Sequence, residues 1–264
     1  MSLNTFFHEP RDGGRTYVWL RIAFGLTAVL WLLSLHPFLG FFYGAEGLCP
    51  PERFALPAWA VTAAWWGTLA AVVFAAAGRF YCPSSVVQFL GIVFFFRTPC
   101  RPDNYGDQIF ASLAFLMMFL PRSPGDASPW LHKTLRLYAG TLYLVPLLYR
   151  LGGAQWWDGT AAWTALADPS TSRVWLLLSR NPWSLPDWVY AAITYASLAF
   201  EGLFPFLIWI RRLRLPIVIA GVIFHVAMGS VLDLGLFPLQ MIVVLIGCLD
   251  DGSISRARAS AGSP

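Results

Sequence analysis

Two ionisable residues lie deep inside apolar stretches of the sequence, Glu201 in YASLAFEGLFPFLIW and His225 in IVIAGVIFHVAMGSV. The turn RRLR joins the two stretches, and Glu201 lies ten residues before this turn while His225 lies eleven residues after it. With a helical rise of about 1.5 Å per residue, both side chains are expected about 15 Å from the turn. Antiparallel helices would bring them to the same depth, so we expect Glu201 and His225 to form a buried pair.

A buried Glu201–His225 pair has two interpretations. A charge in the middle of a bilayer costs about 2.5–3.5 kcal/mol on insertion scales, so the Glu201 carboxylate is expected to have a partner. In the functional interpretation the pair handles protons or binds a ligand in a cavity of the helical bundle. In the structural interpretation it is a hydrogen bond that only fixes helix packing. The first is favoured, because ionisable residues inside membrane spans commonly mark functional sites.

The segment LLYRLGGAQWWDGTAAW, residues 147–163, places Arg150 between a long apolar run and a glycine-rich turn with two tryptophans. Arg150 could be a membrane anchor, an ion-pair partner or part of a reaction centre, and Trp157 and Asp158 are candidates for the same site. The run Asp158-Gly159-Thr160 predicts a turn into a short helix over residues 161–167, with Asp158 or Thr160 as its cap.

A second polar cluster, RPDNYGDQIF, precedes another apolar run. Asp103 and Arg101 in this cluster are typical of a helix cap with surface ion pairs. Asp107 has the better functional claim because it opens the apolar run, and we include it among the candidate ligand-binding residues.

The chain has four cysteines and no CxxC motif, so neither a zinc site nor any other metal site is expected. Cys49 and Cys100 fall in predicted outer loops, whereas Cys82 and Cys248 fall near the predicted inner face. If a disulfide forms, we expect it between Cys49 and Cys100, since only that pair would meet an oxidising compartment.

The composition places these residues in a bilayer. Of 264 residues, 57% are hydrophobic and only 12% are charged, whereas soluble domains carry roughly 25% charged residues. The net charge of +4 comes mostly from arginines that lie between apolar runs. This placement indicates topology signals rather than a phosphate-binding face, so no nucleic-acid partner is expected.

The predicted fold class is all-α, a polytopic transmembrane helical bundle of about eight spans, because eight apolar segments approach the ~20 residues that span a bilayer. The segments cover residues 16–36, 59–77, 81–97, 107–120, 133–150, 187–210, 215–233 and 236–249. With both termini in the cytoplasm, twelve cations lie inside and six outside, which favours this orientation. We expect no cleavable signal peptide, one transmembrane domain over residues 1–251 and a flexible tail over 252–264.

The longest outer connection, residues 151–186, is rich in tryptophan. Tryptophan suits the headgroup region, where the ring is buried and its N–H stays hydrated. We expect this outer interfacial segment to lie on the membrane or to fold back into the bundle.

Six motifs occur in an order that resembles the HTTM domain, the membrane domain of vitamin K-dependent gamma-carboxylases and their bacterial relatives. They are LRIAFG, FFYGAEGL, NYGDQIF followed by FLMMFLP, LLYRLGGAQWWDGTAAW, LAFEGLFPFLI and FHVAMGSVLDLGLFPLQM. The likeness covers about residues 16–249 and implies a helical bundle with its reaction centre toward the outer half. It also implies a quinone or a vitamin K-type naphthoquinone as cofactor.

The resemblance places Arg150 at the position of the family's catalytic lysine, ahead of Leu151 and the W-x-x-G element that begins at Trp156. A desolvated lysine can act as a base, whereas arginine keeps its proton. Arg150 is therefore expected to hold an anion or a quinone oxygen.

The leading expectation is a carboxylase-like protein of the bacterial cytoplasmic (inner) membrane that binds a quinone or another lipid-like ligand. One alternative is a non-catalytic subunit or assembly factor of a larger membrane protein complex, in which Arg150 only anchors its helix. Another is an enzyme that modifies a secreted peptide with a different base. A co-purified quinone would favour the first possibility, and comigration with a larger complex would favour the second. A peptide substrate encoded by a neighbouring gene would favour the third.

Overall fold

A computed structural model describes residues 14–43, 56–97, 105–121, 129–176 and 185–251. Every regular element in these ranges is a helix, and the one β-type contact is an isolated antiparallel bridge between Ser172 and Leu232. The all-helical prediction is confirmed. Cys49, Cys100, Asp103 and the tail 252–264 lie outside the described residues.

Each of the eight predicted apolar segments contains a helix. These helices are α2 (Gly14–Leu35), α5 (Ala58–Ala76), α6 (Tyr81–Phe96), α7 (Tyr105–Met117), α8 (Pro129–Arg150), α12 (Asp187–Leu207), α13 (Arg214–Val231) and α14 (Phe237–Gly247). Short elements complete the chain: η1 (His36–Phe38), α3 (Leu39–Tyr43), α9 (Ala154–Trp157) and α10 (Ala161–Ala167).

Four of the described helices are long and apolar enough to cross a membrane: the one that begins with α2, and α5, α12 and α13. α6 and α14 are apolar but shorter. α7 has 13 residues and is about 20 Å long, less than the roughly 30 Å of a hydrocarbon core. The structure thus shows an all-helical protein with four candidate spans.

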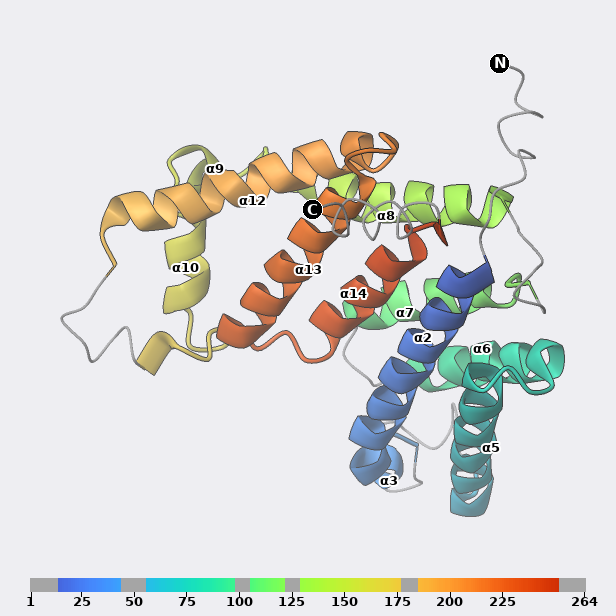
Figure 1. Ribbon diagram of the computed structural model, residues 1–264. Helices are drawn as coiled ribbons and strands as arrows, with labels where there is room; N and C mark the ends of the chain where they lie inside the picture. Colours follow the sequence, from blue (N-terminus) through green and yellow to red (C-terminus); the bar gives the residue numbers. More distant parts are fainter. Residues whose placement is uncertain (1–13, 44–55, 98–104, 122–128, 177–184, 252–264) are drawn as a thin grey trace, which may run out of the picture. The chain divides into compact units, whose positions relative to one another are not determined.

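The chain divides into two compact units, with the boundary after Leu131. The N-terminal unit contains the helices from α2 to α7, and the C-terminal unit contains nearly all of α8 and the helices from α9 to α14 (Figure 1). Each unit has polar contacts of its own.

Side-chain hydrogen bonds to backbone carbonyls connect successive helices of the N-terminal unit. The Trp65 indole N–H donates to the Leu32 carbonyl at 3.0 Å, which joins α5 to α2. The Tyr81 hydroxyl donates to the Met117 carbonyl at 2.5 Å, which joins α6 to the end of α7. Such bonds satisfy the polar ends of aromatic side chains that are otherwise buried.

α2 approaches α5 closely at Gly25. A Cβ atom on Gly25 would lie 2.5 Å from the Ala76 Cβ, whereas one on Gly67 would meet nothing within 4 Å. We expect Gly25→Ala to destabilise the protein by about 1–3 kcal/mol, because the helices must separate. Gly67→Ala is the matched control and should stabilise the protein slightly, because alanine is the better helix former by up to about 1 kcal/mol. Thermal unfolding in detergent micelles measures both, and equal shifts would show that the contact at Gly25 is not tight.

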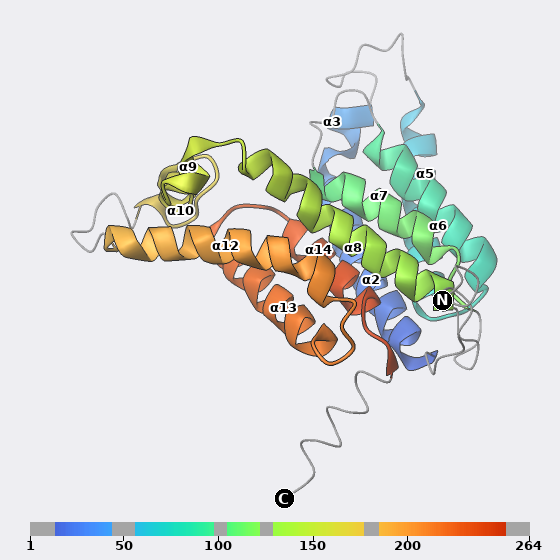
Figure 2. The ribbon, with the colours of Figure 1, turned by 90° about the horizontal axis from the view of Figure 1, so that it is seen from above.

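In the C-terminal unit, α8 and α12 run in opposite directions (Figure 2). α9 and α10 lie beside the first half of α12, where the Thr194 hydroxyl donates to the Gly159 carbonyl at 3.1 Å. Gly159 has a φ of +80°, and a Cβ there would come within 2.9 Å of Ala191. Glycine is therefore required at this turn both by the backbone conformation and by the space available.

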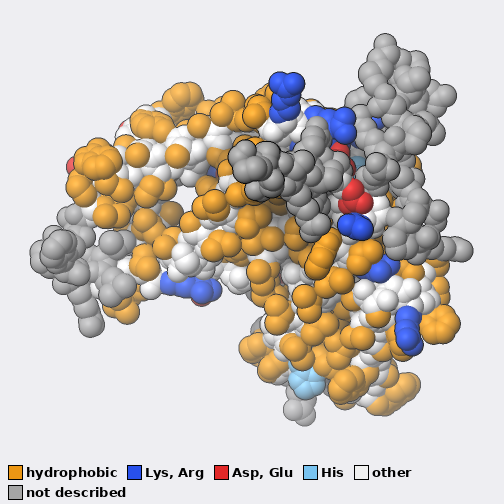
Figure 3. Space-filling view, in the orientation of Figure 1, with side chains coloured by type: hydrophobic (Ala, Val, Ile, Leu, Met, Phe, Trp, Pro, Cys, Tyr) orange, Lys and Arg blue, Asp and Glu red, His pale blue; other side chains and the backbone are white. Residues whose placement is uncertain are grey.

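Large hydrophobic side chains remain exposed on the outward faces of these helices. Trp188, Phe206 and Ile223 are examples on α12 and α13, and Figure 3 shows hydrophobic groups spread over both helices. Soluble monomers rarely expose continuous apolar surfaces of this kind. The exposed side chains are compatible with a location in the bilayer.

Candidate functional site

One face of α8 carries three polar side chains, Arg136, Tyr143 and Arg150, at intervals of seven residues. Seven residues are close to two helical turns, so the three side chains lie on one face, about 10 Å apart along the axis. Each contacts a polar group on another segment of the C-terminal unit. Two of these contacts contain the candidates Arg150, Glu201 and His225.

Arg150 forms an ion pair with Glu201 of α12. The Glu201 side chain is only 5% exposed, whereas that of Arg150 is 29% exposed. The guanidinium group also lies over the Trp156 ring, 4.7 Å from its centroid, in a cation–π arrangement. Of the three roles considered for Arg150, the structure shows the second: Arg150 is an ion-pair partner that neutralises the buried Glu201 carboxylate.

His225 of α13 forms a hydrogen bond with Tyr143 of α8, with 2.8 Å between the Tyr143 hydroxyl and Nε2. Either atom can be the donor, depending on the tautomer of the imidazole. The rings of Phe224 and Phe237 pack against His225, and those of Phe200 and Phe204 against Tyr143. The pair is thus a neutral polar contact inside an aromatic cluster.

The expected contact between Glu201 and His225 is not formed in the described structure, because each residue has another partner. Equal distances from the connecting turn do not fix the rotation of a helix about its axis, and the two residues contact α8 seven residues apart, at Arg150 and at Tyr143. Phe200, the neighbour of Glu201, packs between α8 and α13, with its ring 5.3 Å from that of Tyr143 and 5.1 Å from that of Phe224. Glu201 points about 100° away from Phe200, and its carboxylate contacts Arg150 of α8 rather than a residue of α13.

Two atoms of this site keep unused hydrogen-bonding capacity. Glu201 Oε2 and His225 Nδ1 are buried and have no hydrogen-bond partner among the described residues. Buried polar atoms normally have partners, and an exception calls for an explanation. The backbone carbonyl of Glu201 is a third such group, because Pro205, four residues later in α12, has no N–H to donate to it.

Trp157 and Asp158 shape the turn that follows α8. The Trp157 side chain is exposed and its indole N–H donates to the Leu151 carbonyl at 2.8 Å. The Asp158 carboxylate accepts hydrogen bonds from the hydroxyl and the backbone N–H of Thr160, and these bonds lower the pKa of Asp158. Trp156, which begins the W-x-x-G element but was not a candidate ligand-binding residue, is the tryptophan that contacts Arg150.

The predicted helix over residues 161–167 is confirmed as α10, Ala161–Ala167. Its N-cap residue is Thr160, but no side-chain cap bond forms, because the Thr160 hydroxyl donates to Asp158 instead. The acidic residue therefore stabilises the turn before the helix rather than the helix end itself.

Asp107 belongs to the N-terminal unit and takes part in a different contact. It lies in the first turn of α7, is buried, and accepts a hydrogen bond from the Trp31 indole N–H at 2.7 Å. This bond joins α7 to α2. The contact gives Asp107 a role in packing.

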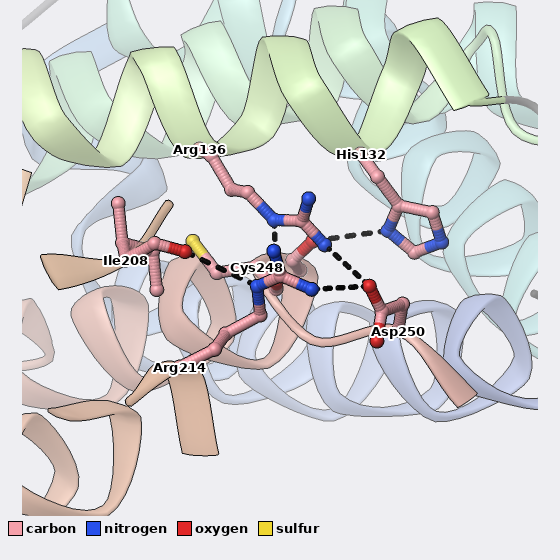
Figure 4. Close-up of polar contacts among 7 residues, drawn as sticks. His132, Arg136, Ile208, Arg214, Cys248 and Asp250 are labelled. Carbon is pink, nitrogen blue, oxygen red and sulfur yellow. Dashed lines mark hydrogen bonds and ion pairs between the residues drawn. The ribbon is translucent and has the colours of Figure 1, made fainter. Parts of the chain in front are cut away.

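A third polar group of the C-terminal unit lies at the other end of α8 (Figure 4). Arg136 and Arg214 both bind Oδ2 of Asp250, which follows α14. Their Nε atoms donate to backbone carbonyls, Arg136 to Cys248 at 2.9 Å and Arg214 to Ile208 at 3.1 Å. We call Arg136, Arg214 and Asp250 the arginine–aspartate cluster.

No local sequence pattern predicts this cluster. Arg136 and Arg214 are among the twelve cations that the topology prediction places inside, and Asp250 is not among the candidate site residues. All three residues are almost fully buried. An arginine next to an apolar run can be an exposed membrane anchor or one side of a buried ion pair. The two roles can be told apart only if a carboxylate on another segment is known to lie at the same depth.

Within the described ranges, no group of three or more His, Cys, Asp or Glu residues could hold a metal ion. Among the described residues, Cys82 and Cys248 form no disulfide. Comparison of the chain with protein-family models, with curated proteins and with solved structures gives no match.

Proposed function

We propose that the chain is a membrane protein similar to HTTM domains, and that its C-terminal unit binds a quinone or another lipid-like ligand. The binding site comprises the Arg150–Glu201 ion pair and the Tyr143–His225 hydrogen bond. The observation that carries this proposal is the pair of buried atoms without partners, Glu201 Oε2 and His225 Nδ1. The ring hydroxyls of a reduced quinone could donate to Glu201 Oε2 and either donate to or accept from His225 Nδ1, and the apolar ring would fit the aromatic surroundings.

The residues of this site have different chemical capacities. Arg150 can donate hydrogen bonds or balance negative charge, but it cannot accept a proton at physiological pH. The Glu201 carboxylate can accept hydrogen bonds, and the His225 imidazole can either donate or accept at its free nitrogen. Proton transfer at a bound ligand would therefore involve Glu201 or His225, with Arg150 as the fixed counter-ion.

Arg150 variants test the ligand-binding proposal. Arg150→Lys keeps the charge but loses the planar array of donors, so affinity for a prenylated naphthoquinone should fall roughly tenfold, the equivalent of about one hydrogen bond. Arg150→Ala should weaken binding further, because Glu201 loses its counter-ion. Quenching of tryptophan fluorescence in detergent micelles measures binding, since Trp156 lies against Arg150.

The control for these variants is Arg173→Lys, which alters an exposed ion pair with Asp233. It should leave the affinity for the naphthoquinone unchanged. Unchanged affinity in Arg150→Ala would remove Arg150 from the binding site and would favour a role as a helix anchor.

We further propose that the protein lies in the bacterial inner membrane with eight spans, both termini in the cytoplasm and the tryptophan-rich segment outside. Ser170 is exposed in this segment. In a variant without other reactive cysteines, Ser170→Cys should react with a membrane-impermeant maleimide added outside intact spheroplasts. Reaction only after the cytoplasmic side is opened would contradict this orientation.

A further inference from the structure

The turn between α5 and α6 lies beside the first part of α2, in the N-terminal unit. α2 and α5 run in opposite directions (Figure 1), and one helical turn before Gly25 the Arg21 side chain reaches Gly78, just after α5. A Cβ atom on Gly78 would lie 2.8 Å from Nη2 of Arg21, so the guanidinium group lies directly against the glycine backbone. The guanidinium carbon also lies 5.6 Å from the centroid of the Tyr81 ring. The turn thus holds the charged end of Arg21 between a glycine and an aromatic ring.

Arg21 has no counter-ion within the described parts of the chain. Its Nε atom is buried without a hydrogen-bond partner, and its Nη atoms form no hydrogen bond or ion pair with any described residue. By contrast, Arg136, Arg150 and Arg214 each bind a carboxylate. A guanidinium group keeps its charge at physiological pH, and a half-buried charge is normally paired. The Nη atoms of Arg21 are therefore donors available to an anion from outside the chain.

A second arginine, Arg79, follows Gly78 in the same turn. The Arg79 N–H donates to the Phe74 carbonyl at 2.9 Å, and the Gly78 N–H donates to the Ala75 carbonyl at 3.0 Å. These are the two bonds of a Schellman motif, in which Gly78 has a φ of +71°. The Arg79 backbone is therefore fixed, while its side chain is exposed and has no ion-pair partner among the described residues. Adjacent Cα atoms are about 3.8 Å apart, so the side chains of Arg79 and Arg21 can reach the same anion.

Helix lengths place this turn at the edge of the hydrocarbon core. α5 has 19 residues and is about 28 Å long, close to the roughly 30 Å of the core, so its end falls near a boundary. The helix that begins with α2 continues to Tyr43 over 30 residues, about 45 Å, so its first turns can extend past that boundary. The proposed topology puts Arg21 and Arg79 on the cytoplasmic side, where anionic lipids give the membrane surface a negative potential.

Two phenylalanines give the same turn an apolar surface. The Phe74 and Phe80 side chains are 45% and 76% exposed, and their rings pack edge to face with 6.3 Å between the centroids. Phe80 has a φ of +48°, a conformation that bulky residues rarely adopt. The turn therefore presents an aromatic ring outward, beside two arginines, in a strained backbone conformation. An anion that carries its own apolar chains fits both parts of this surface.

We propose that the turn between α5 and α6 binds the headgroup phosphate of an anionic phospholipid. Arg21 and Arg79 donate hydrogen bonds to the phosphate oxygens, and Phe74 and Phe80 lie against the acyl chains. A free phosphate ion would use the arginines but would leave the phenylalanines uncovered. This inference rests on the proposed membrane location and is independent of the quinone site, which lies in the C-terminal unit.

Native mass spectrometry of the full chain in detergent, titrated with phosphatidylglycerol, tests the proposal. The protein should bind phosphatidylglycerol more tightly than phosphatidylcholine with the same acyl chains. Arg21→Gln should lower the affinity for phosphatidylglycerol about tenfold, because charge-assisted hydrogen bonds are lost. The matched control is Arg97→Gln, which removes an exposed arginine at the other end of α6 and should leave the affinity unchanged.

Gly78→Ala separates a built site from general electrostatic attraction, because it changes no charge. The added methyl group would displace the Arg21 guanidinium from its place in the turn, so the affinity for phosphatidylglycerol should fall severalfold. Millimolar inorganic phosphate, added at constant ionic strength, should not displace the lipid. Displacement by inorganic phosphate would assign the site to a free anion and would overturn the lipid proposal.

Protection of arginines in the unmodified protein covers the case in which the variants fail to fold. Phenylglyoxal modifies accessible arginines, and peptide mapping by mass spectrometry gives the rate at each one. Phosphatidylglycerol should slow modification of Arg21 and Arg79 at least fivefold relative to phosphatidylcholine, and it should not protect Arg97. Equal protection of all three arginines, or protection of none, would overturn the proposal, as would equal affinities in the wild type and in Arg21→Gln.

Failure of this proposal and failure of the proposed function give different results. Arg21→Gln should keep the wild-type affinity for the naphthoquinone, since Arg21 and the quinone site belong to different units. Labelling of Ser170→Cys tests the membrane orientation without either ligand. Loss of lipid selectivity with intact quinone binding and outside labelling would reject the phospholipid site alone.

Discussion

Asp250→Ala is expected to destabilise the protein by about 3–5 kcal/mol, the typical cost of removing one partner of a buried ion pair. The change leaves both Arg136 and Arg214 without their carboxylate, and neither side chain can reach water without unpacking the helix that carries it. Titration of the purified protein from mild detergent into SDS, followed by circular dichroism, measures the loss of stability.

Asp233→Ala is the matched control for Asp250→Ala. Asp233 also forms an ion pair with an arginine, Arg173, but the two side chains are 66% and 50% exposed. Exposed pairs typically contribute about 0–1 kcal/mol. A loss for Asp250→Ala as small as the loss for Asp233→Ala would show that the arginine–aspartate cluster does not hold the C-terminal unit together.

Arg150→Met should also destabilise the protein by about 3–5 kcal/mol, because it leaves the buried Glu201 carboxylate without a partner. Glu201→Gln should cost less, since the partly exposed Arg150 can turn toward water while Glu201 cannot. The double variant Arg150→Met/Glu201→Gln should be nearer to the wild type than the sum of the single losses. Additive losses in this double-mutant cycle would show that the two side chains do not interact in solution.

A double-mutant cycle on Glu201→Gln and His225→Ala tests whether these two residues contact each other, as predicted from the sequence, or have separate partners, as in the structure. Each residue has a different described partner, so their losses should be additive within about 0.5 kcal/mol. A coupling energy above about 1 kcal/mol would favour a direct Glu201–His225 contact.

The sequence was sufficient to predict the helices but not the partners within them. The apolar runs predict the eight longest described helices, because the hydrophobic pattern determines which segments are buried or face lipid. The turn after Asp158 and the helix that follows were also predictable from local residue preferences. Which side chains pair depends on the rotation of each helix about its axis, and this rotation is set by packing against segments far away in the sequence.

Arg150 illustrates this limit. Its position at the end of an apolar run allowed three roles, and the choice among them required knowing that Glu201 faces α8 rather than α13. The arginine–aspartate cluster shows the same limit, because Asp250 lies 114 residues from Arg136 along the chain. No local pattern distinguishes a buried arginine of this kind from an exposed one.

The central claim is that the Arg150–Glu201 and Tyr143–His225 contacts form a binding site for a lipid-like ligand. The most direct test is mass spectrometry of the lipids extracted from the purified wild type and from the double variant Arg150→Met/Glu201→Gln, which should keep the fold. We expect a quinone in the wild type and at least a tenfold lower content per mole of protein in the variant. A wild type that carries no enriched quinone or other ring-bearing lipid, or a folded variant that retains the same amount, would contradict the claim.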